Sequence, residues 1–351
     1  MFDSHHYVPI LKGKAGEFAS LGEISSKCKS GMTPLIELIT KDREKRKIED
    51  DCGKLSKSWS DTRPIFIDVY LDINDDARSS VGSMRAYFDK ARLISLTIIP
   101  VTGLRRHSDY QSLIQDICSK DKKGVCLRVE STDMADEEEL KKQLQLFLKA
   151  FKMNESEVDL LVDFKEIPLT QVPLFQMMAG TILSYLPNIK KWRTLTLAAT
   201  TFPISMGDFQ SANISIRQRG EWTIWTNIRS LRSYGRIPTF GDYAIANPVI
   251  TDFDPRIMDM TANIRYTIER DWLVLKGRGV KRFGYPQFRS ISRTLVGRPE
   301  FSGAGFSAGD NYISNCAAGN VSTGNMTTWR RVGTTHHLTF VVDRISSLPV
   351  I

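Results

Sequence analysis

Six charged side chains stand near the ends of short apolar runs, at a spacing that would gather them into one polar site. Carboxylates in such a set can bind Mg²⁺, and cations can clamp a phosphate or a carboxylate. A pair of carboxylates can also perform general acid–base catalysis. The six candidate residues are Lys12, Glu37, Asp68, Arg128, Asp163 and Asp242.

The same six residues also fit a structural role. Charges inside a barrel can pair in layers that only hold the strands together, and Lys12 with Glu37, like Arg128 with Asp163, would be neighbours across adjacent strands. Charges crowded into one cleft also perturb one another's pKa values. The set therefore predicts a polar site without specifying a reaction, and the sequence leaves open whether the protein is an enzyme.

The elements that would position these side chains are eight short apolar runs with helical patterns between most of them. Alternating strands and helices predict a parallel sheet and an α/β fold. Eight such units predict a closed (β/α)8 barrel of the TIM type, in which functional residues sit at the C-terminal ends of the strands. The predicted strands are 7–12, 33–39, 64–71, 96–101, 124–129, 158–164, 192–201 and 243–247.

The chain has 351 residues, more than the roughly 250 that one barrel needs, so an insertion or extension is expected. Residues 1–255 are predicted to form the barrel, with an exposed, partly helical, mixed-charge excursion at 40–63 that has almost no apolar stripe. Residues 256–326 are predicted to form a long α+β insertion or subdomain that is basic and Gly-rich. Residues 327–351 would hold the final barrel helix and the C-terminus.

The insertion is predicted to begin with antiparallel strands at 262–268 and 271–275, and a basic segment follows at 276–298. Basic residues attract phosphate and aromatic residues stack on bases, so this segment could bind nucleic acid. The favoured interpretation is a solvated extension whose basic groups pair with acids elsewhere, or a surface that meets a protein partner. A net charge of +8 does not by itself imply nucleic acid. The candidate binding residues are Lys276, Arg278, Lys281, Arg282, Phe283, Tyr285, Arg289 and Arg293.

Other patterns restrict the function classes. Five scattered cysteines without a CxxC pair predict free thiols in the cytoplasm and no structural zinc. The apolar stretch 172–189 contains Gln176 and two prolines, which predicts a buried barrel helix and no membrane partner. No GxSxG, HExxH or GxGxxG motif is present, so the cofactor is unknown, with Mg²⁺ possible. The adjacent His336 and His337 predict a cap or a core hydrogen bond, because on a helix they would point about 100° apart.

The chain resembles the beta protein family over most of its length. This family is known from satellite phages, prophages and bacterial mobile islands. Its namesake belongs to the gop–beta–cII locus, where beta counteracts killing by the Gop protein. The segments that carry the resemblance are YVPILKGKAGEFASL at 7–21, MTPLIELI at 32–39, RPIFIDV at 63–69, FGDYAI at 240–245, FSAGDNYISNCAAGN at 306–320 and TTWRRVGTTHH at 327–337.

The resemblance implies an antiviral defence component, an antitoxin or immunity protein that restrains a Gop-like toxin encoded nearby. It supplies no catalytic residues. Two alternatives remain open from the residues themselves. One is a TIM-barrel enzyme that acts on a phosphorylated or nucleotide-like ligand at the barrel mouth. The other is a nucleic-acid binder that acts through residues 276–298.

Overall fold

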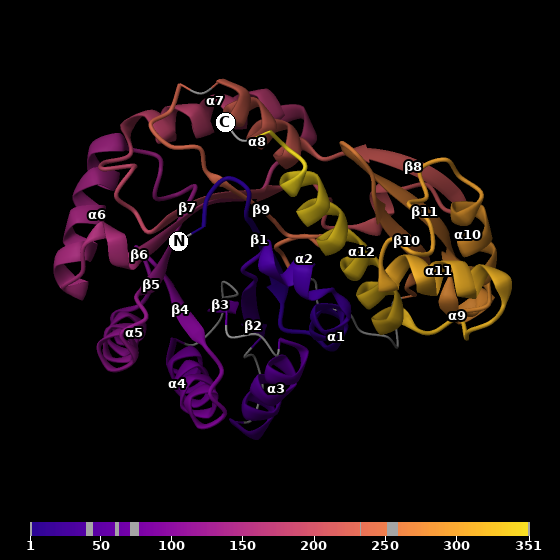
Figure 1. The fold of residues 1–351 in the computed structure, drawn as a ribbon, viewed down its shortest axis with the longest axis horizontal. Coiled ribbons are helices and arrows are strands. Elements are labelled where there is room, and N and C mark those ends of the chain that lie inside the picture. The colour runs from indigo at the N-terminus through magenta and orange to yellow at the C-terminus, as the bar shows by residue number, and fades with distance from the viewer. Residues whose placement is uncertain are drawn as a thin grey trace.

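The structure is a computed structural model that describes residues 2–39, 45–59, 63–70, 77–231, 233–250 and 259–349. These residues form a barrel ringed by helices, with a smaller sheet unit beside it (Figure 1). The domain boundary predicted at 255 and 256 lies outside the described residues, as do the segments 40–44 and 60–62 of the predicted excursion.

Eight parallel strands close the barrel, in the order β1-β2-β3-β4-β5-β6-β7-β9. Most of their residues are apolar and buried, as expected for strands of a parallel sheet that is covered on both faces. The predicted (β/α)8 architecture is therefore confirmed. The strands are β1 (Tyr7–Lys12), β2 (Leu35–Ile39), β3 (Ile65–Tyr70), β4 (Ile98–Gly103), β5 (Val125–Glu130), β6 (Val158–Glu166), β7 (Thr194–Thr200) and β9 (Thr239–Asp242).

The last barrel strand lies earlier than predicted. Residues 243–247 are not a strand, because β9 ends at Asp242, which pairs with Pro9 of β1 and Ala199 of β7. Ala244 then adopts a φ of 51°, which ends the extended conformation, and its N–H donates to Asp242 Oδ1 at 2.9 Å. Buried turn residues are as apolar as a buried strand, so the apolar pattern alone misplaced the element.

Helices cover the outer surface of the barrel (Figure 1). Helix α6 shows why the sequence forms them: Asp136 accepts from the N–H of Glu139 at 2.7 Å, and Leu140, Leu144 and Phe147 bury one face. The helices of the barrel are α1 (Ala15–Glu23), α2 (Ser26–Ser30), α3 (Lys45–Ser58), α4 (Ala77–Leu93), α5 (Ser108–Asp121), α6 (Glu137–Phe151), α7 (Val172–Tyr185) and α8 (Gly220–Leu231), with 3-10 turns at Glu155–Glu157, Leu169–Gln171 and Met206–Asp208.

The described part of the predicted excursion at 40–63 is helical as expected, but one face of the helix is buried instead of exposed. Helix α3 buries Ile48, Cys52 and Leu55, and Trp59 directly after it is also buried. These residues follow one another at intervals of four, three and four, which is helical spacing. This apolar stripe is narrow and lies among many charged residues. The sequence pattern therefore did not reveal it.

A three-stranded antiparallel sheet, in the order β10-β11-β8, forms the centre of the subdomain. The predicted pair at 262–268 and 271–275 is confirmed as β10 and β11. Strand β8 was not predicted, because it comes from the connection between β7 and α8. We define the subdomain by the elements β8 (Asn213–Gln218), β10 (Thr261–Thr267), β11 (Asp271–Gly279), α9 (Val280–Phe283), α10 (Gln287–Val296) and α11 (Ala308–Ala318).

Helix α12 (Met326–Ser346) returns the chain to the barrel and confirms the final helix predicted in residues 327–351. It lies between the barrel and the subdomain (Figure 1). Two glycines permit its close packing. A Cβ on Gly16 of α1 would lie 2.9 Å from the carbonyl oxygen of Thr327, and one on Gly333 would lie 3.0 Å from that of Arg265. Real Cβ atoms do not tolerate the first distance, so α1 and α12 approach each other through a glycine.

The apolar core has separate parts in the barrel and the subdomain. One large cluster lies between the barrel strands and their helices, and a smaller one fills the barrel interior. A further cluster packs β10 and β11 against α10, α11 and α12. Among the described helices, none has the length and apolar character needed to cross a membrane.

Candidate functional site

Five of the six predicted site residues meet inside the C-terminal end of the barrel. All five are 4% exposed or less, and they come from five different strands: Lys12 from β1, Glu37 from β2, Asp68 from β3, Arg128 from β5 and Asp163 from β6. Side chains alternate along a strand, so these residues share the inward face with the apolar residues of the barrel interior. We call these five residues, together with Arg106 and Tyr243, the mouth network.

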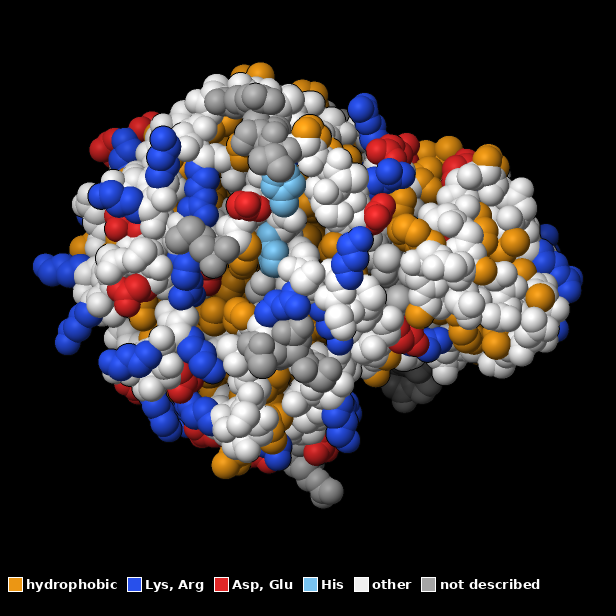
Figure 2. Space-filling view, in the orientation of Figure 1, with side chains coloured by type: hydrophobic (Ala, Val, Ile, Leu, Met, Phe, Trp, Pro, Cys, Tyr) orange, Lys and Arg blue, Asp and Glu red, His pale blue; other side chains and the backbone are white. Residues whose placement is uncertain are grey.

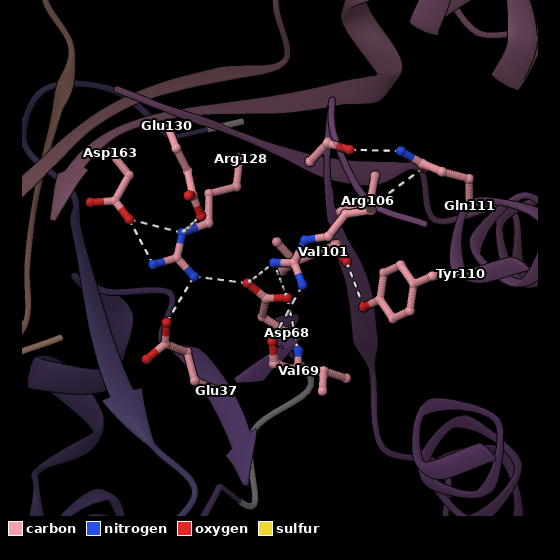
Figure 3. Close-up of polar contacts among 12 residues, drawn as sticks. Glu37, Asp68, Val69, Val101, Arg106, Tyr110, Gln111, Arg128, Glu130 and Asp163 are labelled. Atoms are coloured by element: carbon pink, nitrogen blue, oxygen red, sulfur yellow. Dashed lines mark hydrogen bonds and ion pairs between the residues drawn. The ribbon is translucent and has the colours of Figure 1, made fainter. Parts of the chain in front are cut away.

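Arg128 is the centre of the mouth network (Figure 3). Its Nε donates to Asp163 Oδ2 at 2.8 Å, and its Nη1 donates to Glu37 Oε1 and to Asp68 Oδ2, both at 2.8 Å. Its Nη2 lies 2.6 Å from the hydroxyl oxygen of Tyr243. A guanidinium donates from a planar fork, so this one side chain joins carboxylates from three strands.

Two further cations complete the mouth network. The ammonium of Lys12 pairs with Glu37 Oε2 and donates to the carbonyl oxygen of Pro248 at 2.6 Å. Arg106 Nη2 donates to both carboxylate oxygens of Asp68, at 2.9 and 3.1 Å. The sequence reasoning missed Arg106, although its position three residues after the end of β4 was a usable signal. Three cations thus face three carboxylates: Lys12, Arg106 and Arg128 with Glu37, Asp68 and Asp163.

The pairing fixes the ionisation state of Glu37. Burial alone would raise the pKa of its carboxyl, but the charges of Lys12 and Arg128 outweigh burial and lower that pKa to about 2. Burial also raises the pKa of the Tyr243 hydroxyl well above its ordinary value. Glu37 is therefore a stable anion and Tyr243 a stable neutral donor near pH 7. Neither group is poised to exchange a proton, since general acid–base catalysts need a pKa near the working pH.

Asp242 is not brought into the mouth network. It is the last residue of β9, and its side chain points away from the barrel interior, where its neighbour Tyr243 stands instead. The hydroxyl of Tyr243 donates to Asp163 Oδ2 at 2.6 Å. The shift by one position follows from the misplaced eighth strand, because a shift of one residue exchanges the two faces.

Asp242 instead belongs to a second buried cluster, between the barrel and helix α12. Its carboxylate accepts from the hydroxyl of Tyr7, lies 3.0 Å from His337 Nε2 and pairs with Arg219 Nη2 at 3.4 Å. Burial would raise the pKa of Asp242, but His337 and Arg219 outweigh burial and lower it. We call these residues, with Glu221, the outer network. Its members are Tyr7, Arg219, Glu221, Asp242 and His337.

Glu221 is the carboxyl of the outer network whose pKa is raised. Burial raises its pKa to about 7, with the nearby charge of Asp242 acting in the same direction and that of Arg219 opposing it. Its Oε2 accepts from the backbone N–H and the hydroxyl of Thr201, both at 3.1 Å. Its Oε1 is buried and has no hydrogen-bond partner, although Arg219 Nε lies 3.5 Å away.

The adjacent histidines of α12 make different contacts: His337 bridges the barrel and the subdomain, whereas His336 hydrogen-bonds to the subdomain alone. His337 lies against Asp242 of the barrel, and its Nδ1 is 2.7 Å from the Thr267 hydroxyl. His336 Nδ1 lies 2.9 Å from Asp310 Oδ2 of the subdomain, and its Nε2 is 2.8 Å from the Thr267 carbonyl oxygen. Both rings are fully buried. The structure thus shows core hydrogen bonds for both histidines, which is one of the two roles predicted for this pair.

The predicted binding residues of the basic segment divide into those that donate to carbonyl groups of the protein and those that remain at the surface. Lys276 is buried, and its ammonium donates to the carbonyl oxygens of Met206 and Phe209 at 2.8 and 2.7 Å. Arg289 and Arg293 donate to the carbonyl oxygens of Val321 and Ala317, at 3.4 and 2.9 Å. These three cations hold the subdomain together.

The aromatic residues of the segment divide in the same way. Tyr285 stacks on the buried Phe288, with ring centroids 6.3 Å apart, whereas Phe283 is 42% exposed at the end of α9. The guanidinium carbons of Arg278 and Arg282 lie 5.0 and 5.4 Å from the centre of the Phe283 ring. We call Arg278, Lys281, Arg282 and Phe283 the α9 tip. Lys and Arg side chains also gather at the end of the subdomain farthest from the barrel (Figure 2).

Few carboxylate oxygens of the mouth network remain free to coordinate a metal ion. The three mouth carboxylates already accept from Lys12, Arg106 and Arg128, so a cation such as Mg²⁺ would have to displace protein cations. Within the described part of the chain, no three His, Cys, Asp or Glu side chains are grouped so that they could hold a metal.

The fold and the site define a (β/α)8 barrel protein with a charge-paired mouth and an added sheet subdomain. The family model of the Beta protein matches residues 7–343, nearly the whole chain, so this protein belongs to the Beta protein family. The family is associated with phages and prophages. The search of curated proteins found no match.

Proposed function

We propose that this protein is an immunity component of a phage-borne or prophage-borne defence system, which restrains a killing protein encoded beside it by binding that protein. Membership of the Beta protein family supports the mobile-element setting and a Gop-like partner. The five described cysteines are free and buried, which supports an action in the reducing cytoplasm.

One observation carries the choice of binding over catalysis: every charged group of the mouth network is paired with an opposite charge inside the protein. Every charged group in it has an oppositely charged partner within 3.1 Å. Catalytic sites instead hold groups whose pKa values suit proton transfer near neutral pH. The mouth network thus supports a barrel that serves as a rigid scaffold.

The surface that we propose for the partner is the α9 tip. Arg278 and Arg282 have no carboxylate within ion-pair distance among the described residues, and they flank the exposed ring of Phe283. Arginine and aromatic side chains are enriched at the energetic centres of protein interfaces. The matching surface on the killing protein would carry acidic residues, because charge complementarity speeds and orients association.

Capture of the killing protein by this chain tests the proposal. We would co-express both proteins, purify this chain and measure how much of its partner is retained. Arg278→Glu combined with Arg282→Glu is expected to lose the partner. Lys120→Glu combined with Lys149→Glu makes the same change of charge on exposed positions of α5 and α6 and is expected to retain it. Equal retention by both double variants would place the interface elsewhere, and no retention by the wild type would contradict the proposed function.

A further inference from the structure

A recess opens at the N-terminal end of the barrel, the end opposite the mouth network. Its volume is about 320 Å³, which is near the lower end of the usual range for ligand pockets. Several of its lining residues stand at or just before the starts of β3, β4, β6 and β7. We call it the basal recess, and the lining residues that matter for its chemistry are Phe2, Phe66, Ile99, Lys122, Lys123 and Arg193.

One side of the basal recess is apolar. Phe66 and Ile99 are paired across β3 and β4, and both belong to the apolar cluster that fills the barrel interior. Phe2 packs against the same cluster, with its ring edge-on to that of Phe66 and 6.4 Å between the ring centroids. The ring of His6 stacks on Phe2 with centroids 4.2 Å apart, which holds the phenyl ring in place. Aromatic pairs favour such offset and edge-on arrangements, so this side suits the ring of an aromatic ligand.

The other side of the basal recess carries positive charge. Lys122 and Lys123 are exposed and come from the turn between α5 and β5. Across the residues that the structure describes, no carboxylate lies within ion-pair distance of either lysine. Arg193 and Asp159 also line the recess, but they pair with each other at 2.6 Å. Two positive charges therefore remain without a counter-ion beside the apolar side chains, which favours an anionic ligand.

The backbone of the lysine turn is fixed by contacts to its surroundings. The N–H of Lys122 donates to the carbonyl oxygen of Cys118 at 3.0 Å, and Arg193 Nη1 donates to the carbonyl oxygen of Lys123 at 2.8 Å. Arg193 is itself oriented by Asp159, because its Nε donates to Asp159 Oδ1 at 3.0 Å. Both lysine side chains thus start from a fixed backbone at the edge of the recess. On this end of the barrel, hydrophobic side chains are exposed among Lys and Arg side chains (Figure 2).

We propose that the basal recess binds a small aromatic acid. Its ring would pack against Phe2 and Phe66, and its carboxylate would lie near the two lysines. Ligand pockets commonly combine apolar walls with a few charged groups that fix the orientation of the ligand. The functional loops of (β/α)8 enzymes gather at the opposite end of the barrel, so the basal recess is a binding site and not a reaction site. The proposal goes beyond the proposed function, because neither the mouth network nor the α9 tip contributes to this recess.

Calorimetric titration of the full chain tests this site. The probes are benzoate and indole-3-acetate, at matched ionic strength. Benzamide keeps the ring without the charge, and acetate keeps the charge without the ring. Lys122→Gln combined with Lys123→Gln removes both charges from exposed positions, so the fold is expected to persist. Lys120→Gln combined with Lys149→Gln is the matched control, because it makes the same change at exposed positions that do not line the recess.

We expect saturable binding of at least one aromatic acid by the wild type and unchanged binding by the control variant. Benzamide and acetate should bind at least about tenfold more weakly, and the variant without Lys122 and Lys123 should lose about tenfold in affinity for the acid. Phe2→Ala should show a similar loss, because it removes one of the two rings. No saturable binding of either acid by the wild type, equal binding by the variant without the two lysines, or equal binding of benzamide would overturn the proposal.

Discussion

Arg128 donates a hydrogen bond at 2.8 Å to Asp163 on the neighbouring strand, and Tyr243 donates to the same carboxylate oxygen at 2.6 Å. Asp163 is fully buried and Arg128 is 3% exposed. Each therefore depends on the other to offset the free energy of removing a charge from water. The pair therefore joins β5 and β6 through side chains, in addition to their backbone pairing.

Replacement of Asp163 with Asn is expected to destabilise the fold. The variant leaves Arg128 buried with one carboxylate fewer, and loss of one partner of a buried pair typically costs about 3–5 kcal/mol. Urea unfolding would measure the change in the free energy of unfolding. Glu138→Gln is a suitable control, because Glu138 is 83% exposed in its side chain and its ion pair should contribute less than about 1 kcal/mol. Equal stability of Asp163→Asn and wild type would contradict a structural role for the mouth network.

The stability contributed by Glu37 should depend on pH in a defined direction. The pKa of Glu37 is lowered from 4.5 to about 2 in the folded protein, so the ionised group stabilises the fold above pH 4.5. This contribution is lost as the pH falls from 4.5 through 2. Glu37→Gln should therefore be less stable than wild type by about 3 kcal/mol at pH 7, with a difference that shrinks steadily below pH 4.5. A difference that is constant from pH 7 to pH 3 would argue against this ionisation.

Much of the barrel could be predicted from the sequence, because parallel strands buried on both faces leave apolar runs. Seven of the eight runs fall on barrel strands, and five charged strand ends meet in the mouth as predicted. The exceptions have local physical causes. Tyr243 was assigned to a strand because its buried turn is apolar, and Asp242 was therefore placed on the wrong face.

The subdomain was less predictable, because its sheet joins segments that are distant in the sequence. Strand β8 pairs with β11, although more than 50 residues separate them, and neither segment alone indicates this pairing. The outer network also joins residues that are distant in the sequence, since His337 contacts Asp242, 95 positions earlier in the chain. A single sequence gives no information on such contacts.

Glu221 should have the opposite pH dependence to Glu37. Burial raises its pKa from 4.5 to about 7, so the folded state favours its protonated form. Its contribution to stability is therefore fully present below pH 4.5 and declines as the pH rises from 4.5 to 7. Glu221→Gln mimics the protonated form and should match wild type at pH 4.5. At pH 8 it should be more stable, by up to about 3 kcal/mol. Thermal unfolding at the two pH values measures this, and a variant that is less stable at pH 8 would refute the assignment.

The two histidines of α12 should secure different parts of the junction, because only His337 contacts the barrel. His337→Phe removes the contacts to Asp242 and Thr267, and a buried carboxylate that loses a hydrogen-bond partner costs about 1–3 kcal/mol. His336→Phe should do the same for Asp310 in the subdomain. Amide hydrogen exchange would locate the effects: faster exchange in β9 and β1 for the first variant, and in α11 for the second. His107→Phe, at an exposed N-cap of α5, is the control. Faster exchange confined to α12 in both histidine variants would contradict the separate roles of His336 and His337.

Nucleic-acid binding, if it occurs, should depend on the α9 tip alone. Lys276, Arg289 and Arg293 are already engaged by backbone carbonyl groups of the subdomain. Retention on RNA or DNA columns should therefore be weak and should disappear at moderate salt, since few cations remain to contact phosphates. Strong retention that persists in Arg278→Glu with Arg282→Glu would show that another surface binds nucleic acid.

Rescue from killing tests the central claim most directly. The killing protein encoded beside this gene would be co-expressed with wild type, with Asp163→Asn under conditions where that variant is shown to be folded, and with the double variant Arg278→Glu, Arg282→Glu. If the protein restrains its partner through the α9 tip, we expect wild type and Asp163→Asn to rescue the cells. We expect the double variant to lose rescue. Rescue by the double variant together with its loss in folded Asp163→Asn would place the function in the barrel mouth and contradict the proposal.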